Sequence, residues 1–233
     1  MTMLNDFLPT SATWGVLLTL AAFALGTFIN RKTGKAIFNP LLLGTVFVIV
    51  FLSVCSIPYA DYKASASPVS YLLLPATVSL AVPLYEQWDL LRKNVLAIVM
   101  GILAGTLASL GSVLVLALLL KLDHSQYITL LPKSVTTAIS MDVSRELGGI
   151  AALTGAIVIL TGILGALMAE TVCKVCHITH PIARGIGIGT AAHAVGTSKA
   201  LQMGEVEGAM SGLAVAVAGV MTAILCPIFS SLI

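Results

Sequence analysis

The sequence predicts an all-α integral membrane protein. Of its 233 residues, 58% are apolar and 9% are charged, and the mean hydropathy is +1.04. Five stretches without a charged residue are long enough to cross a hydrocarbon core of about 30 Å. Backbone groups in lipid find partners only within the segment, so these stretches are expected to be helices. A soluble enzyme is excluded, and a net charge of +2 does not favour nucleic-acid binding.

The five expected spans follow one another along the chain. They cover residues 11–30, 37–57, 95–120, 147–169 and 208–233. The first is preceded by Asp6 and followed by Arg31 and Lys32, which is the charge order of a retained anchor with its N-terminus outside, not of a signal peptide.

Three further apolar segments are interrupted. Residues 71–85 contain Pro75 and Pro83, residues 128–147 contain Pro132 and several charges, and residues 185–204 are rich in Gly and Thr. Unwound backbone at membrane depth is tolerated where it is buried in protein or lines a wet cavity. Such segments indicate a binding or permeation site, so we expect two or three broken or re-entrant helices.

The basic residues indicate the orientation and a possible internal repeat. They gather at 31–35, 92–93 and 174–184, which the positive-inside rule assigns to the cytoplasm. Residues 128–147 then enter and leave on the outer side. We expect one polytopic domain over 1–233, with a peripheral part (1–36), a first repeat (37–120), a broken polar segment (128–148) and a second, inverted repeat (149–233). The repeats would be parallel instead if all three broken segments crossed the membrane.

One broken segment carries a candidate anion site. The run from Leu131 to Thr137 places Lys133 beside Ser134, Thr136 and Thr137, between apolar flanks. A lysine near membrane depth is expected to meet an anion or a carboxylate. The alternative is an interfacial Lys133 whose amine reaches water. The hydroxyls favour neither reading decisively, and both stay open.

A second broken segment carries the other candidate residues. His193 lies among small residues between Thr190 and Thr197, which leaves space for a ligand or for close packing. We expect an anion site near mid-membrane where Thr77, residues 133–137 and residues 189–197 converge. Two stripes of small residues (Gly101, Gly105 and Ser109; Gly204, Gly208, Gly212 and Ala216) predict close helix packing, either within the chain or with a partner.

Other polar groups indicate no further chemistry. Cys173, Cys176 and His177 match the haem-attachment pattern C-x-x-C-H, and with His180 they resemble a zinc cluster, but a membrane-surface loop is the simpler interpretation. Asp142 and Arg145 are expected to pair on a solvated helix end. No catalytic constellation is evident, so we expect no enzyme activity, no cofactor and no bound metal.

Several motifs resemble the LrgB/CidB family of bacterial inner-membrane proteins, to which the C-terminal half of the plant plastid glycolate/glycerate transporter is related. The resemblance spans roughly residues 30 to 230. Ala138 departs from the family pattern, which usually has proline there, and the Cys173–His180 cluster has no counterpart in it. The matching segments are residues 74–87, 131–137, 148–150, 161–165, 189–197 and 207–209.

The resemblance implies a multi-pass protein of the bacterial cytoplasmic (inner) membrane. It implies transport of a small organic anion, a monocarboxylate such as pyruvate, glycolate, glycerate or lactate, together with a smaller LrgA/CidA-like membrane partner in a homo- or hetero-oligomer. An older view of the family implies a holin- or antiholin-like component that modulates lysis and murein hydrolase export. Broken polar segments favour the carrier, because a lytic pore needs a wide oligomeric lumen.

Overall fold

A computed structural model describes residues 13–33, 38, 40–72, 75, 78–79 and 81–233. These residues form helices and short connections, and no strand occurs among them. The chain separates into two compact units, Met1–Ser79 and Leu80–Ile233. The expected all-α membrane architecture is confirmed.

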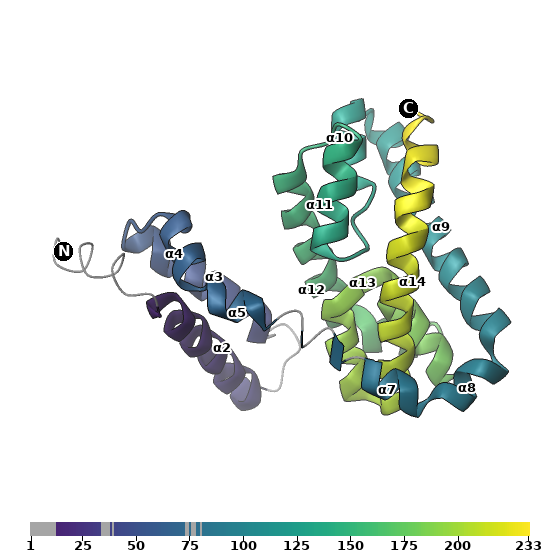
Figure 1. Cartoon of the computed structure of the whole chain (residues 1–233), viewed down its shortest axis with the longest axis horizontal. Helices are drawn as coiled ribbons and strands as arrows, with labels where there is room; N and C mark the ends of the chain where they lie inside the picture. Colours follow the sequence, from purple (N-terminus) through teal and green to yellow (C-terminus); the bar gives the residue numbers. More distant parts are fainter. Residues whose placement is uncertain (1–12, 34–37, 39, 73–74, 76–77, 80) are drawn as a thin grey trace. The chain divides into compact units, whose positions relative to one another are not determined.

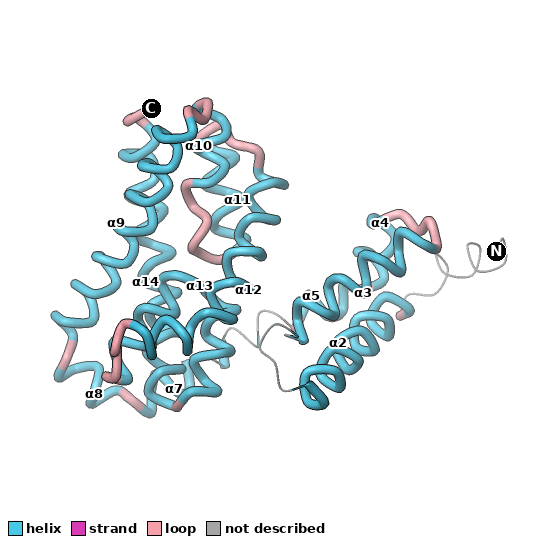
Figure 2. The backbone as a smooth tube through the Cα atoms, turned by 180° about the vertical axis from the view of Figure 1, so that it is seen from behind, coloured by secondary structure: helices cyan, strands magenta, loops and turns pink. Residues whose placement is uncertain are grey.

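The first unit contains α2 (Trp14–Thr33), α3 (Pro40–Val54), α4 (Tyr59–Ser65) and α5 (Ser67–Tyr71). Figures 1 and 2 show α2 and α3 side by side. Gly26 permits this packing, since a Cβ there would lie 2.6 Å from the carbonyl oxygen of Pro40. A hydrogen bond of 2.8 Å between Thr19 and Tyr62 fastens α4 to α2.

Within the described residues, four helices have the length and composition to cross a membrane: α2, α9 (Val95–Leu120), α12 (Ala151–Val175) and α14 (Glu205–Ser230). The remaining expected span, residues 37–57, is shorter than predicted. Its helix, α3, has 15 residues, or about 22 Å at 1.5 Å per residue. Pro40 begins α3, as proline commonly begins a helix, and Ser56 has a φ of 54° two residues after α3 ends.

The second unit is built around α13 (Pro181–Met203) and α14, which pack closely against each other. It also contains α7 (Ala81–Glu86), α8 (Trp88–Lys93), α9, α10 (His124–Leu130), α11 (Thr137–Glu146) and α12. Lys121, with φ 51° and ψ 47°, ends α9, and Asp123 and Gln126 form a capping box that starts α10.

The α10–α11 pair is a hairpin that returns to the end of the unit at which it began. His124, at the start of α10, lies 2.8 Å from the carbonyl oxygen of Ile233 at the C-terminus. After the break at residues 131–136, α11 runs back, so that Ser144 bonds Thr154 in the first turn of α12 at 2.7 Å. The figures show α10 and the C-terminus at the same end of the unit. We call this pair, residues 124–146, the first hairpin.

Helix α13 is also a hairpin, folded at a single residue. His193 has φ 42° and ψ −140°, which no α-helix contains. A Cβ on Gly196 would lie 3.0 Å from the carbonyl oxygen of Ile188, whereas residues eight apart in a straight helix are about 12 Å apart. The first arm (181–192) therefore folds back into a second arm (194–203). We call α13 the second hairpin; it confirms that residues 185–204 are broken.

The two hairpins enter the unit from opposite ends. The second hairpin has its base beside the start of α14, where Arg184 lies 3.8 Å from Glu207. The first has its base beside the end of α14, where the hydroxyl of Tyr127 donates a 2.9 Å hydrogen bond to the carbonyl oxygen of Phe229. The tips consequently approach each other within the unit.

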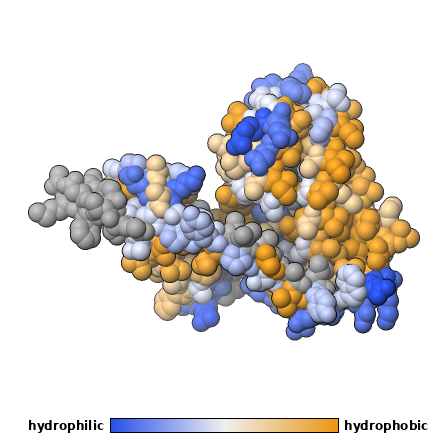
Figure 3. Space-filling model, viewed as in Figure 1, coloured by the Kyte–Doolittle hydropathy of each residue, from blue (hydrophilic) through white to orange (hydrophobic). Residues whose placement is uncertain are grey.

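A polar layer separates two apolar clusters along α9. One cluster includes Ile98 and Ile102 with α13 and α14, and the other includes Leu110 and Val113 with α10 and Cys226. Between them lie Gly105, Thr106 and Ser109, at the middle of the 26-residue helix. Figure 3 shows a largely apolar outer surface over α9 and α14, with hydrophilic residues towards their ends. This surface suits lipid, so the polar layer belongs near mid-membrane.

Candidate functional site

The tip of the first hairpin holds Lys133 against the middle of α9. The Lys133 Nζ donates to Ser134 Oγ at 3.1 Å and to Ser109 Oγ at 3.5 Å. Ser109 in turn donates to Ser134 at 2.8 Å. Ser140 donates to the carbonyl oxygen of Pro132 at 2.6 Å, which fastens the tip to α11. The ammonium group is therefore positioned by Ser109 of α9 and by Ser134 of the tip itself.

Lys133 lacks an acidic partner in the part of the chain that the structure describes. The ion pairs found there join Arg145 to Asp142, Lys174 and Lys199 to Glu170, and Arg184 to Glu207. Lys133 is half-buried, and its hydrogen bonds point to hydroxyls in the polar layer. A cation without an acidic partner can form its ion pair with the carboxylate of a ligand.

The N-terminus of α11 adds neutral donors to the same tip. The first backbone N–H groups of any helix lack an intrahelical acceptor. In α11 the N-cap residue Thr136 makes no side-chain capping bond to them, so they are available to a ligand. The Thr136 and Thr137 hydroxyls make no hydrogen bond to other described residues, and both are half-buried. The positive end of a half-helix dipole near mid-membrane suits an anion.

At the tip of the second hairpin, His193 is packed against α12. Its Nε2 lies 3.0 Å from the carbonyl oxygen of Val158, so Nε2 carries the proton that is donated. A Cβ on Gly162 would lie 2.6 Å from this ring, so only glycine allows the ring to occupy its position. The space that small residues leave around His193 is thus filled by α12. The backbone of His193 adopts a conformation that normally requires glycine, at a cost of about 1–3 kcal/mol.

Thr190 and Thr197 flank this tip with different contacts. Thr190 donates to the carbonyl oxygen of Ile186 at 2.8 Å and faces α9, where a Cβ on Gly105 would lie 2.7 Å from its hydroxyl. Thr197 is buried and bonds the His193 carbonyl oxygen at 3.1 Å and Ser211 of α14 at 2.9 Å. Thr190 therefore borders the polar layer, whereas Thr197 fastens the second arm to α14.

Two of the three expected segments thus reach neighbouring turns of α9. Lys133, Ser134, Thr136 and Thr137 lie at one tip, and Thr190, His193 and Thr197 lie at the other. Lys133 and Ser134 contact Ser109, and Thr190 contacts Gly105. Ser109 and Gly105 are one helical turn apart, or about 6 Å. No hydrogen bond joins the two tips among the described residues. Thr77 lies outside the described residues, so its place in the site stays a prediction.

Two residues that contact the predicted site residues were not singled out from the sequence. Ser109 appeared there as one member of a small-residue stripe, and Ser211, which bonds Thr197, had no distinguishing signal. Each small-residue stripe packs within the chain at one glycine. Gly105 receives Thr190, and a Cβ on Gly208 would lie 2.3 Å from Leu201 of the second arm.

Two other sequence features have simple structural roles. Among the described residues no group of three or more His, Cys, Asp or Glu side chains could hold a metal ion, and this covers Cys173, Cys176, His177 and His180. Arg145 and Asp142 pair at 3.1 Å with side chains 66% and 69% exposed, so they form a solvated pair.

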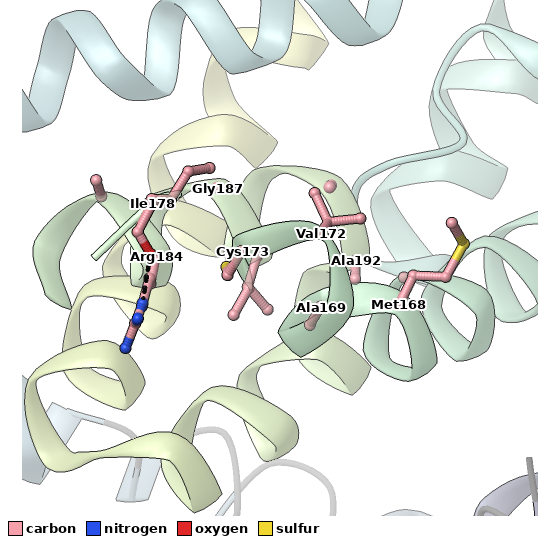
Figure 4. A pocket seen from close by; sticks show the side chains of 12 residues that line it. Met168, Ala169, Val172, Cys173, Ile178, Arg184, Gly187 and Ala192 are labelled. Carbon is pink, nitrogen blue, oxygen red and sulfur yellow. Dashed lines mark hydrogen bonds between the residues drawn. The ribbon is translucent and has the colours of Figure 1, made fainter. Parts of the chain in front are cut away.

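A cavity of about 290 Å³ lies between α12 and the first arm of α13. Figure 4 shows Met168, Ala169, Val172 and Cys173 along it, with Arg184 at one end donating to the carbonyl oxygen of Ile178 at 2.7 Å. Its lining is almost entirely apolar and its guanidinium is already engaged. It offers a carboxylate few free donors.

Comparisons with known proteins agree with this architecture. A model of the LrgB-like family matches residues 19–232. The chain is 38% identical over 221 residues to the antiholin-like protein LrgB of Bacillus subtilis, covering 94% of this chain and 96% of that protein. Proteins of the same name from Bacillus mycoides and Bacillus cereus are 36% identical over 217 residues, covering 93% of this chain and 94% of each relative. No solved structure is significantly similar.

Proposed function

The chain belongs to the LrgB-like family of multi-pass membrane proteins, and from that premise we propose that it carries small monocarboxylates across a membrane. The substrate class is that of pyruvate, glycolate, glycerate and lactate. The observation that carries the proposal is the position of Lys133. This half-buried cation is held by Ser134 and by Ser109, which lies at the middle of the spanning helix α9.

The chemistry of the tip suits a desolvated carboxylate. A carboxylate that leaves water needs charge-assisted hydrogen bonds to replace its hydration. Lys133 supplies the charge, and the Thr136 and Thr137 hydroxyls and the free N–H groups of α11 supply neutral donors. A hydroxy or keto group of the substrate would bond to Ser134, whose hydroxyl accepts from Ser109 and Lys133 and donates to no other described residue.

The hairpin arrangement suits a carrier better than an open pore. One hairpin lies between the polar layer and each end of the second unit, so movement of either would expose the site to one side. Helices that break near mid-membrane and enter from opposite faces are typical of secondary transporters. The positive-inside rule puts the base of the second hairpin, with Arg184 and Lys199, on the cytoplasmic side.

His193 is the candidate for proton coupling. Nε2 donates to the Val158 carbonyl oxygen, while Nδ1 makes no hydrogen bond to other described residues and is an acceptor in the neutral ring. Protonation of Nδ1 would add a positive charge beside the polar layer.

A second candidate function has the support of the relatives' names, which favour it over transport. Three Bacillus relatives are called antiholin-like proteins. On this alternative, the chain modulates lysis and murein hydrolase export, and its expression changes dye leakage or membrane depolarisation without saturable carboxylate flux.

We propose the bacterial cytoplasmic membrane as the location and a smaller LrgA/CidA-like membrane protein as the partner, on the strength of the family. Gly105 and Gly208 of the two small-residue stripes already contact other segments of the chain, so the argument for an oligomer rests on the family and not on these glycines. Co-purification in mild detergent tests the partnership. A strictly monomeric chain with full transport activity would refute it.

Uptake of labelled pyruvate and glycolate into proteoliposomes, with and without the partner, tests the main proposal. Saturable uptake that other short monocarboxylates inhibit is expected, together with an unchanged permeability to a trapped dye. Dye leakage without saturable uptake of any two- or three-carbon acid supports the antiholin-like function instead.

A further inference from the structure

A groove runs from the basic end of the second unit to the polar layer. It lies between α9 and the first arm of α13 and encloses about 430 Å³, within the range of about 300–1,000 Å³ that is usual for ligand sites. Asn94, Ala97, Gly101 and Gly105 line it on α9, and His180, Ile186, Gly187 and Thr190 are among its residues on α13.

The two ends of the groove differ in chemistry. Asn94 and His180 are the N-cap residues of α9 and α13, and both lie at the end of the unit that carries Arg92 and Lys93. Arg92 and Lys93 are exposed, as is Asp89 of the same helix, so α8 gives the mouth a small net positive charge, which is favourable to an anion. At the far end Thr190 meets Gly105. Gly105 is one helical turn of α9 before Ser109, which contacts Lys133.

The α9 wall of the groove is kept low by glycine. A Cβ on Gly101 would have only ordinary contacts with Ile186, the nearest at 3.5 Å, so Gly101 is not needed for close packing. Gly105 is different, because a Cβ there would lie 2.7 Å from the Thr190 hydroxyl. The groove therefore has room for a solute beside Gly101, and the Gly105–Thr190 contact closes its inner end.

We propose that this groove is the hydrated path by which a small organic anion reaches the polar layer from the basic side, and that the Gly105–Thr190 contact is its inner constriction. The inference rests on the proposed function and adds a route and a sidedness to it. The structure then represents a state open towards the basic end and closed before Lys133. The other possible occupant, a lipid chain, would leave the groove dry.

Cysteine accessibility distinguishes these occupants. Gly101→Cys places a thiol in the groove, and Gly111→Cys places one on the same helix beyond the polar layer, where a Cβ has no neighbour within 4 Å. Both are made in a background with Cys55→Ser and Cys176→Ser, which removes the half-buried and the exposed native cysteines; Cys173 and Cys226 are buried. A charged, membrane-impermeant maleimide is applied to inside-out vesicles and, separately, to spheroplasts.

A hydrated groove predicts that Gly101→Cys reacts at least about tenfold faster than Gly111→Cys, because the reactive thiolate forms in water and not in lipid. The reaction is expected in inside-out vesicles only, and saturating pyruvate or glycolate should slow it. Slow labelling from both sides, labelling from the outer side alone, or labelling that neither acid slows would overturn the proposal.

The experiment separates failure of the route from failure of the function. If uptake into proteoliposomes is saturable but Gly101→Cys is unreactive, the route is wrong and the function stands. Should the wild-type protein transport no acid, the function fails, whatever the thiol does.

Discussion

Ser109 donates a 2.8 Å hydrogen bond to Ser134, and this contact joins the middle of α9 to the break between α10 and α11. The Lys133 ammonium donates to both hydroxyl oxygens, at 3.5 Å to Ser109 and 3.1 Å to Ser134. The cation is thereby held in the polar layer instead of reaching outward to water. This geometry favours the anion-site reading of Lys133 over the interfacial one.

Lys133→Met should raise the KM for monocarboxylate uptake about 10- to 150-fold, because a charge-assisted hydrogen bond contributes about 1.5–3 kcal/mol and 1.4 kcal/mol is tenfold. Lys133→Arg should recover part of the loss. Initial rates in proteoliposomes measure the effect. Lys174→Met, which removes a cation whose side chain is 77% exposed, is the control. Normal transport by Lys133→Met would remove the site assignment and leave only the family membership.

Two substitutions of His193 distinguish the role of its backbone conformation from the role of its imidazole. His193→Gly should be more stable than His193→Ala by about 1–3 kcal/mol, since glycine adopts the φ of 42° without strain. Thermal unfolding in detergent compares the two variants. Equal stability would show that the strained backbone does not matter.

If the His193 imidazole carries a coupled proton, both variants should lose the pH dependence of uptake between about pH 5 and 8 while substrate still binds. Flux into proteoliposomes at a series of pH values measures this. A lower protein yield with an unchanged pH profile in the surviving protein would identify His193 as a packing residue only.

Gly105→Ala should destabilise the second unit by about 1–3 kcal/mol or displace the second hairpin, because its Cβ would lie 2.7 Å from the Thr190 hydroxyl. Gly111→Ala is the matched control on α9, since no atom lies within 4 Å of its Cβ. Melting temperatures and uptake rates of both variants test this. Equal behaviour of the two variants would mean that Thr190 does not pack on α9 in the membrane.

The Glu170–Lys199 pair fastens the second arm to α12 at 2.6 Å, with side chains 46% and 29% exposed in the isolated chain. Glu170→Gln and Lys199→Met should each lower stability, and the double variant should lose less than the sum. A double-mutant cycle should give a coupling within the roughly 0.2–1 kcal/mol of exposed pairs, because both side chains are partly exposed and Glu170 also pairs with Lys174. Additive losses would mean that the pair does not hold the arm.

The sequence by itself determined the membrane class, the long spans and the segments that break. These follow from local chemistry. Charge-free apolar runs are stable in lipid, whereas Pro132 and the many Gly and Thr residues of 185–204 make a continuous spanning helix unfavourable. Lys133 could be singled out for the same reason, because a cation between apolar flanks is costly without a partner. The exact break was less evident, since the second hairpin folds at His193, although glycines surround it.

The tertiary structure alone decided that both hairpin tips reach the same stretch of α9. Ser109 and Ser134 are 25 positions apart, and His193 depends on Gly162 of another helix, so no local pattern contains either contact. The C-x-x-C-H pattern illustrates the converse, because its spacing is right while its side chains do not gather into a metal site. Local spacing predicts which residues are costly to bury, but only packing between distant segments decides which of them meet.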